Sequence, residues 1–371
     1  MKIVGTCTRG FEEYSAKEAE ILGCRVNELR QARIIMEGGP WCIYLLNNFS
    51  RSLNKVLLLL YRGVARDLDE IYRAASALSY MFIGKQQSFA VRSERSGVHS
   101  FTSIDIQRVV GQAVIDSRIK EDGVRLRVDL ENPDVEINAD LIEEELFISI
   151  NTTGHGLNFR EYRKYNHPSS LKPTLAASLL IMAGWDGRPL IDAFAGGGTI
   201  PIEAALFARS APVRPSGDFM YKKLSLYDQQ EEERAIKSVG PKFAVSKLVG
   251  VEISPKHIRG ALKNAQAAGV ADVVELRLDD SVKFVPESKF DFLVSNPPYG
   301  IRSGRKEKVL RLYELFVKNL DNILKEGGTG LIITTEYRKL ENILAQRGYK
   351  HVKTSVGLHG KLWVGAVLFR A

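Results

Sequence analysis

The sequence predicts an α/β protein in which a mostly parallel sheet, covered by helices on both faces, follows two smaller α+β units. From residue 189 onward, seven strand-like segments are separated mostly by helix-length stretches, which is typical of a parallel sheet. Only "HG" at 359–360 separates the last two segments, so we expect a hairpin with one antiparallel strand at the sheet edge. Earlier in the chain the strands are short and no fixed-period repeat occurs.

The N-terminal half divides into two predicted units. Residues 1–62 open with a strand over 2–8 and an amphipathic helix over 12–22 that ends at Gly23. The second unit, residues 63–155, contains both strands and a helix. Its predicted segments are the strand 88–95, a helix beginning in 103–117, and the alternating strands 132–141 and 145–154.

A polar linker over 156–180 leads into the sheet domain, residues 181–371. The predicted strands of this domain are 189–195, 247–254, 273–280, 290–298, 330–336, 352–360 and 361–370. The charged stretch 209–246 is long for a connection between elements of one sheet. We expect it to form a helical insertion near the mouth of the site.

Composition bounds the class of protein. The 371 residues, 44% of them hydrophobic, suit two or three domains. The longest apolar runs, such as "VLLLL" at 56–60, fall far short of the roughly 20 residues that a membrane-spanning helix needs. The N-terminus lacks the pattern of a secretion signal. We therefore expect a cytoplasmic protein that does not enter a membrane.

The cysteines and the charge add two further expectations. Cys7, Cys24 and Cys42 have neither a zinc spacing nor an even disulfide pattern, so we expect buried, reduced thiols and assign no metal ligands. The net charge is +8, and residues 151–371 carry 33 Lys and Arg against 22 Asp and Glu. This excess fits a nucleic-acid partner and fits an ordinary solvated surface equally well.

The first strand of the sheet domain ends in "DAFAGGGTIP", where Asp192 precedes three glycines and a helix starting near Thr199. Glycines at such a turn let the backbone approach a ligand in the crevice outside the strand ends. A dinucleotide is the obvious competitor. Its fingerprint requires a third glycine where this chain has Pro201, and an acid about twenty residues later that is missing here, so the competitor is weakened.

Acids also end the next two strands. Glu252 ends the second, where a carboxylate can accept both hydroxyls of a ribose. Asp280 ends the third and can accept from an adenine amino group, with Asp279 as a substitute. Carboxylates tolerate a sulfonium and an ammonium but repel phosphates, so this pocket predicts S-adenosylmethionine.

The fourth strand ends in "SNPPYG", which contains no acid, base or thiol. Prolines cannot donate to a sheet ladder, so Asn296 and the Pro297 carbonyl become acceptors that point into the crevice. Two such acceptors can hold both hydrogens of an amine and direct its lone pair toward a methyl group. Tyr299 can stack on the base that carries the amine. The alternative is an ordinary turn rich in turn-forming residues.

Together these motifs resemble a known family. "LKPTLAASLL", "DAFAGGGT", "VEIS", "LDDS" and "NPPYG" resemble the Rossmann-like class I S-adenosylmethionine-dependent amino-methyltransferases. "RSGVHSFTSIDIQRVVGQAV" and "ISINTTGHGLNFREYR" resemble a THUMP domain with its leading ferredoxin-like domain, a module of RNA-modifying enzymes. The layout is similar to that of the tRNA guanosine-N2 methyltransferases that act on the sixth nucleotide, in the acceptor stem.

The resemblance implies roles for particular residues. Asn296 and Pro297 would hold the target amine, and Tyr299 would contact the base. The implied cofactor contacts are Pro173, Thr174, Asp192, Ala195, Gly196, Gly198, Thr199, Glu252, Ile253, Asp279, Asp280, Ser281 and Asn296. The THUMP half is expected to dock the 3′ end of tRNA, and we expect a monomer.

Basic residues elsewhere fit an RNA substrate. Arg302, Arg305, Lys306 and Lys308 follow the motif, where they would hold phosphates beside an extruded base or form a solvated loop. Arg160, Tyr162 and Arg163 lie between the two halves. We expect them to fix the domains together rather than to contact RNA.

Other functions remain open at this point. The tenth tRNA nucleotide is disfavoured because the related enzymes usually carry "DPPYG", whereas large-subunit ribosomal RNA methyltransferases share "NPPYG". A protein glutamine methyltransferase uses a similar motif on an amide. A non-catalytic RNA-binding protein with a relic pocket is a further possibility, opposed by the intact motif.

Overall fold

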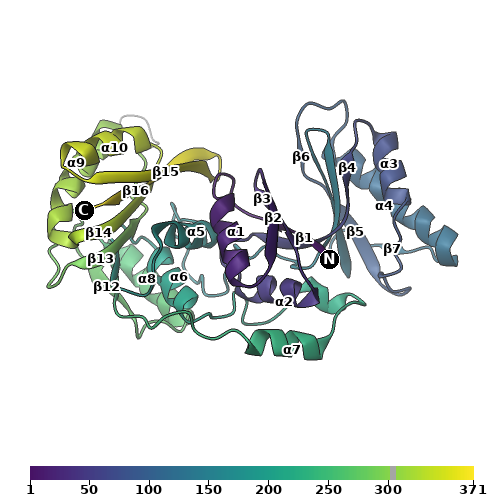
Figure 1. Cartoon of the computed structure of the whole chain (residues 1–371), viewed down its shortest axis with the longest axis horizontal. Coiled ribbons are helices and arrows are strands. Elements are labelled where there is room, and N and C mark those ends of the chain that lie inside the picture. Colours follow the sequence, from purple (N-terminus) through teal and green to yellow (C-terminus); the bar gives the residue numbers. More distant parts are fainter. Residues whose placement is uncertain (301–305) are drawn as a thin grey trace.

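Two sheets organise this computed structural model, and they lie at opposite ends of an elongated molecule (Figure 1). The structure describes residues 1–300 and 306–371, without the side chain of Lys306. The N-terminal sheet has nine strands in the order β2-β3-β1-β4-β9-β8-β5-β7, with β6 paired to β8. The C-terminal sheet has seven strands.

The N-terminal sheet runs without a break through both predicted α+β units. Its elements are β1 (Lys2–Thr6), α1 (Glu12–Ile21), β2 (Arg25–Arg30), β3 (Arg33–Glu37), α2 (Pro40–Phe49), β4 (Lys55–Val64), α3 (Leu68–Ser76), β5 (Ser88–Arg92), β6 (Arg95–Ser96), α4 (Ser103–Asp122), β7 (Arg127–Val128), β8 (Val135–Ile142) and β9 (Glu145–Asn151). The antiparallel pairing of β4 with β9 joins the units. Side chains from all four helices share one hydrophobic cluster, so the two units fold as one layer of helices on one sheet.

The cysteines depart from their predicted state. All three are buried, but Cys24 and Cys42 form a disulfide, so the prediction of three reduced thiols was wrong. Cys24 lies just before β2, and Cys42 lies in α2. Their Cα atoms are 5.9 Å apart, a separation that a disulfide spans easily. This proximity arises from the packing of α2 beside the start of β2, which the spacing of the cysteines does not reveal.

The C-terminal sheet follows the predicted alternation of strands and helices. Its order is β12-β11-β10-β13-β14-β16-β15, and the first five strands are parallel. The closing hairpin of β15 and β16 forms as predicted. The antiparallel strand is β16, which lies between β14 and β15, so it is one place inside the edge rather than at the edge itself.

The second half of the chain supplies the remaining elements. They are α5 (Pro173–Ala183), β10 (Leu190–Asp192), α6 (Thr199–Ala208), the 3₁₀ helix η1 (Met220–Lys223), α7 (Gln229–Lys237), β11 (Leu248–Glu252), α8 (Pro255–Ala267), β12 (Val274–Leu278), β13 (Phe290–Ser295), α9 (Lys306–Ile323), β14 (Leu324–Thr334), α10 (Tyr337–Gln346), β15 (Lys350–His359) and β16 (Leu362–Arg370). None of the helices in the described part of the chain is both long and apolar enough to cross a membrane.

Strand periodicity explains the two covered faces of this sheet. Leu190 packs with α5, α6 and α8, whereas its neighbour Ile191 packs with α9 and α10. Successive side chains of a strand point to opposite faces, so a strand buried on both faces must be apolar throughout. This requirement explains why the strands of the domain read as nearly continuous apolar runs.

The charged stretch 209–246 is helical but does not lie at the mouth of the site. It contains η1 and α7, and Tyr221 and Ala235 join the hydrophobic cluster of the N-terminal sheet. Arg214 donates hydrogen bonds to the carbonyls of Thr153 and His155. The predicted location was wrong because the apolar side of α7 packs against α2 instead (Figure 1). The insertion therefore acts as a brace between the two halves.

A buried ion cluster joins the two halves. Glu203 of α6 accepts hydrogen bonds at 2.9 Å from Arg51 Nη1, from Arg160 Nε and from the Tyr162 hydroxyl. Arg160 also donates to the Arg51 carbonyl, and Arg163 donates to Thr199, so the expectation that this segment fixes the domains together is confirmed. Burial would raise the pKa of Glu203, but the two guanidinium groups outweigh it and lower the pKa.

We predict that Glu203→Gln destabilises the fold by about 3–5 kcal/mol, because it leaves two buried guanidinium groups without a counter-charge. Urea denaturation measures the free energy of unfolding. Glu13→Gln is the matched control, since the Lys353–Glu13 pair crosses the same interface but is roughly half exposed. The control should cost at most about 1 kcal/mol. Equal losses in the two variants would contradict a special role for Glu203.

Candidate active site

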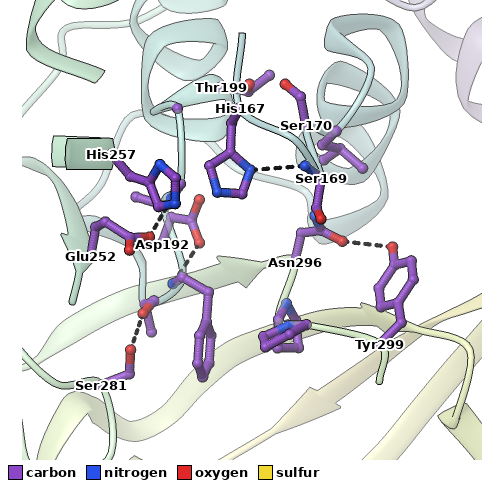
Figure 2. A pocket seen from close by; sticks show the side chains of 18 of the residues that line it. His167, Ser169, Ser170, Asp192, Thr199, Glu252, His257, Ser281, Asn296 and Tyr299 are labelled. Atoms are coloured by element: carbon purple, nitrogen blue, oxygen red, sulfur yellow. Dashed lines mark hydrogen bonds between the residues drawn. The ribbon is translucent and has the colours of Figure 1, made fainter. Parts of the chain in front are cut away.

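The strand order brings four predicted side chains to one edge of the sheet. Asp280, Glu252, Asp192 and Asn296 follow or end β12, β11, β10 and β13, which are neighbours in that order. The carboxyl ends of parallel strands meet at one edge, where α/β sheets bind ligands. All four residues line a cavity of about 880 Å³ (Figure 2). Its size suits a ligand of nucleoside dimensions.

Most of the predicted site residues line this cavity, and four do not. The lining residues are Asp192, Ala195, Gly196, Thr199, Glu252, Ile253, Asp280, Ser281, Asn296, Pro297 and Tyr299. Pro173 and Thr174 are buried in the first turn of α5, and Thr174 donates to Asn54. Gly198 caps α6 behind the turn, and Asp279 accepts from the Asp280 amide beside the cavity. These four do not reach the cavity.

The glycine turn forms the floor of the cavity. Gly196 and Gly198 have φ angles of 54° and 77°, which favour glycine over other residues. A Cβ atom on Gly196 would lie 3.5 Å from the His167 ring, and one on Gly197 would lie 3.4 Å from His167 Cβ, so the turn packs directly against this residue. The Gly196 amide donates to Glu252 Oε2 at 3.0 Å, and the Ser254 amide donates to Oε1 at 2.9 Å. These bonds fix the carboxylate toward the turn.

Asp192 is held by groups that the sequence did not single out. The Ser295 hydroxyl donates to its Oδ1 at 2.9 Å and accepts from the Ala193 amide at 2.7 Å. The Phe194 amide donates to the same oxygen. Burial raises the pKa of Asp192 to about 7, helped by nearby Glu252, against these hydrogen bonds. The carboxyl group is thus poised to ionise when a cation binds next to it.

In the part of the chain that the structure describes, one of the two acceptors predicted at the end of β13 is occupied and the other is free. The Tyr299 hydroxyl donates to Asn296 Oδ1 at 2.6 Å (Figure 2). Within the described residues, no donor bonds to the Pro297 carbonyl. The next carbonyl, that of Pro298, accepts from the Tyr313 hydroxyl at 2.8 Å, which anchors the loop to α9. His359 Nδ1 lies 3.4 Å from the Tyr299 hydroxyl.

Residues 167–171 form a wall of the cavity, and Tyr165, just before them, is clasped by α8. Asn264 accepts from the Tyr165 amide at 2.8 Å and donates to the carbonyls of Tyr165 and Gly197 at 3.0 Å. The Tyr165 ring lies on Gly260, where a Cβ atom would clash with the ring at 2.2 Å. The clasp therefore connects the wall to the glycine turn.

Two histidines extend this wall. The His167 and His257 rings meet edge to face at 4.2 Å, and Tyr165 bonds to His257 Nδ1 at 2.6 Å. The Ser169 amide donates to His167 Nδ1 at 3.1 Å (Figure 2). Burial and then the neighbouring His257 lower the pKa of His167, so its ring stays neutral near pH 7.

The surroundings of the acids in the cavity are consistent with S-adenosylmethionine, the ligand predicted from the sequence. No Lys or Arg of the described chain forms an ion pair with Asp192, Glu252 or Asp280, and the glycine turn offers space beside His167. Unpaired carboxylates favour a cation with donor hydroxyls and amines, and they oppose a pyrophosphate. The fold and this pocket define a Rossmann-like class I methyltransferase.

Comparison with known proteins agrees with this class. Residues 160–364 match the model of the RMKL-like methyltransferase domain, residues 65–151 match the THUMP domain, and residues 2–57 match the RlmL ferredoxin-like domain. A possible methylase from Clostridium difficile 630 has a solved structure with a TM-score of 0.87 and 26% identity. That similarity covers 99% of this chain and 97% of the other.

Two archaeal relatives define the family more closely. The tRNA (guanine(6)-N2)-methyltransferase of Archaeoglobus fulgidus is 40% identical over 100% of this chain and 92% of its own length. The enzyme of that name from Methanocaldococcus jannaschii is 34% identical over 93% of each chain. The chain belongs to this family of THUMP-containing methyltransferases. It is an S-adenosylmethionine-dependent RNA methyltransferase.

Several residues of the site escaped the sequence argument. His167, Ser169, Ser170, His257, His359 and Leu362 also line the cavity. They come from the linker, the start of α8 and the closing hairpin, which lack strand-end motifs. Among the basic residues after the motif, Arg302 and Arg305 lie outside the described residues, as does the Lys306 side chain, and Lys308 is exposed.

We predict that Asn264→Asp weakens S-adenosylmethionine binding about tenfold, because it loses the amide donor that joins Tyr165 to the glycine turn. Isothermal titration calorimetry measures the dissociation constant. Gln266→Ala on the exposed side of the same helix is the control and should leave the affinity unchanged. Unaltered binding by Asn264→Asp would show that the clasp does not shape the pocket.

A second prediction concerns pH. With a pKa of about 7, Asp192 is mostly protonated at pH 6 and mostly ionised at pH 8. A cationic cofactor favours the carboxylate, so its affinity should rise about tenfold between these two pH values. Calorimetry at both pH values measures the change, and Asp192→Asn should remove it. The same pH dependence in that variant would assign the titration to another group.

Proposed function

We propose that this enzyme transfers the methyl group of S-adenosylmethionine to the exocyclic N2 amine of guanosine 6 in the acceptor stem of tRNA. The observation that carries the proposal is the pair of acceptors at the end of β13, Asn296 Oδ1 and the Pro297 carbonyl. They lie at the same edge as three carboxylates that form no ion pair within the described residues. The nucleotide and the RNA follow from the names of the two archaeal relatives.

Different residues of the cavity would bind different parts of the cofactor. Glu252, fixed by the Gly196 amide, would accept from the ribose hydroxyls, and Asp280 would accept from the adenine amino group. Ile253 is 65% exposed beside Glu252, which makes it an apolar surface for the adenine ring. Asp192 and the clasped segment 165–171 lie toward the cationic end. When bound, the cofactor supplies an electrophilic methyl group on sulfonium.

The acceptors at Asn296 and Pro297 hold the two hydrogens of the amine. An amine conjugated to a base is a poor nucleophile, and this hold directs its lone pair at the methyl carbon as the N–C bond forms. The S–C bond breaks in the same displacement. The nitrogen becomes acidic only after the bond forms, and its proton then leaves to solvent. No strong base is needed beforehand, which explains a motif without an acid or thiol.

Tyr299 already donates to the acceptor that the incoming amine would use. Its hydroxyl occupies Asn296 Oδ1 in the free protein, at the atom that the amine requires. Burial strongly raises the pKa of Tyr299, so the group remains a neutral phenol that donates this bond. We propose that the ring turns to stack on the guanine and releases the Asn296 oxygen to the amine.

The N-terminal half supplies the RNA partner. The THUMP match over residues 65–151 supports binding of tRNA, and we propose that this domain docks its 3′ end while the acceptor stem crosses to the cavity. The buried Glu203 cluster keeps the distance between the two parts constant. We further propose a cytoplasmic monomer, since residues of a single chain form the whole cavity.

The test is methylation of an unmodified tRNA transcript, followed by nuclease digestion and mass spectrometry. The proposal requires N2-methylguanosine in the fragment that contains nucleotide 6. Methylation at nucleotide 10, or of ribosomal RNA instead, would overturn the assignment of the substrate. Label on protein that survives ribonuclease would favour a glutamine substrate. Transfer to no substrate, with RNA binding intact, would indicate a non-catalytic protein.

For the motif, we predict that Asn296→Ala lowers kcat about 100-fold or more and leaves S-adenosylmethionine affinity nearly unchanged, because an acceptor for the amine is lost. Tyr299→Phe should retain most of the activity since the ring still stacks, whereas Tyr299→Ala should lose it. Single-turnover methylation and calorimetry measure the two quantities. Parallel losses of kcat and cofactor affinity in Asn296→Ala would indicate a structural role, and full activity of Tyr299→Ala would exclude stacking.

A further inference from the structure

The first loop of the chain contacts the hairpin beside the active site. The Leu358 amide donates to the Arg9 carbonyl at 3.0 Å. A Cβ atom on Gly10 would lie 2.1 Å from the Val356 carbonyl oxygen, and one on Gly357 would lie 2.2 Å from the Arg9 oxygen. The two backbones therefore meet as closely as glycine permits. Figure 1 shows β15 reaching the N-terminal helix α1 at this place.

This contact creates a pair of a half-buried cation and an exposed aromatic ring. The Arg9 guanidinium carbon lies 5.0 Å from the centre of the Trp363 ring. Trp363 is 52% exposed, and no carboxylate of the described chain forms an ion pair with Arg9. Some arginines at the surface of the sheet domain do form ion pairs, namely Arg188, Arg209 and Arg277. Arg188, for example, stacks on Phe292 and is also paired with Asp186.

The pair lies next to the cavity and among other free cations. Leu362 and His359, which flank the tip of the same hairpin, line the cavity. Lys361, in that tip, and Lys172 are exposed, and neither forms an ion pair within the described chain. Lys172 is close enough to help lower the pKa of His359. The rim of the cavity on this side therefore carries positive charge without compensation.

We propose that Arg9 and Trp363 form a binding site for RNA, in which Arg9 binds a backbone phosphate near the target nucleotide and Trp363 packs on the adjacent nucleotide. The site rests on the proposed function, since it needs an RNA strand at this rim. A guanidinium held flat on an indole keeps its N–H donors free for phosphate oxygens. The indole adds a stacking surface that tolerates any base. The ferredoxin-like domain would then contact substrate through a residue that the catalytic domain orients.

The test compares binding of an unmodified tRNA transcript by fluorescence anisotropy at several salt concentrations, with S-adenosylhomocysteine present. Arg9→Gln should weaken tRNA binding about tenfold near 100 mM salt. It should also reduce the magnitude of the slope of log K against log salt by about 1, because one phosphate contact is lost. Trp363→Ala should weaken binding about as much, and Trp363→Phe should restore most of it. Arg188→Gln is the control. It also removes one positive charge, but Arg188 precedes β10 and so lies at the amino ends of the parallel strands, away from the cavity at their carboxyl ends.

In methylation assays, the variants should raise KM for tRNA and leave kcat and S-adenosylhomocysteine affinity near the wild-type values. A purely structural role would lower kcat and the melting temperature as well. If Arg9→Gln behaves like Arg188→Gln in affinity and salt slope, the proposal is overturned, even if Trp363→Ala fails to fold. Failure of the proposed function is distinguishable, since it appears as wild-type protein that binds tRNA without methylating it.

Discussion

The buried carboxylate of Glu203 is the constraint on which the arrangement of the protein depends. It gathers Arg51 from the N-terminal domain and Arg160 and Tyr162 from the connecting segment around the catalytic domain's own helix α6. A buried charge tolerates few geometries, since each of its oxygens must remain hydrogen-bonded. The proposed docking of the RNA 3′ end at a fixed distance from the target nucleotide requires that rigidity. The brace formed by 209–246 supports the same junction, because its Ala211 carbonyl accepts a hydrogen bond from Arg51.

Strand order then determines the chemistry at the active edge. Side chains that are far apart in the sequence meet because β12, β11, β10 and β13 are neighbours, with their carboxyl ends aligned. In the proposed mechanism the acids bind the cationic cofactor, and the amide and carbonyl after β13 bind the target amine. Ser295 joins these two parts, because it binds Asp192 from the strand that carries Asn296. The proposed binding sites for the methyl donor and for the methyl acceptor therefore belong to one hydrogen-bonded unit.

The sequence predicted what local patterns and strand ends determine. The seven strands of the catalytic sheet and the residues that end four of them were found in this way. It did not predict features that arise from packing between distant segments. The Cys24–Cys42 disulfide, the clasp of Asn264 on Tyr165 and the histidines at 167 and 257 are of this kind. Pro173 and Thr174 are buried in the first turn of α5 and do not line the cavity, so their contact with the cofactor stays a prediction.

The most direct test of the account is to replace guanosine 6 of tRNA with inosine, which lacks only the 2-amino group. Labelled methyl transfer should fall to background, because the acceptors at Asn296 and Pro297 have no amine to hold. The affinity for the RNA should stay unchanged. Undiminished labelling of the inosine RNA would contradict the account, because the methyl group would then be transferred to a different atom.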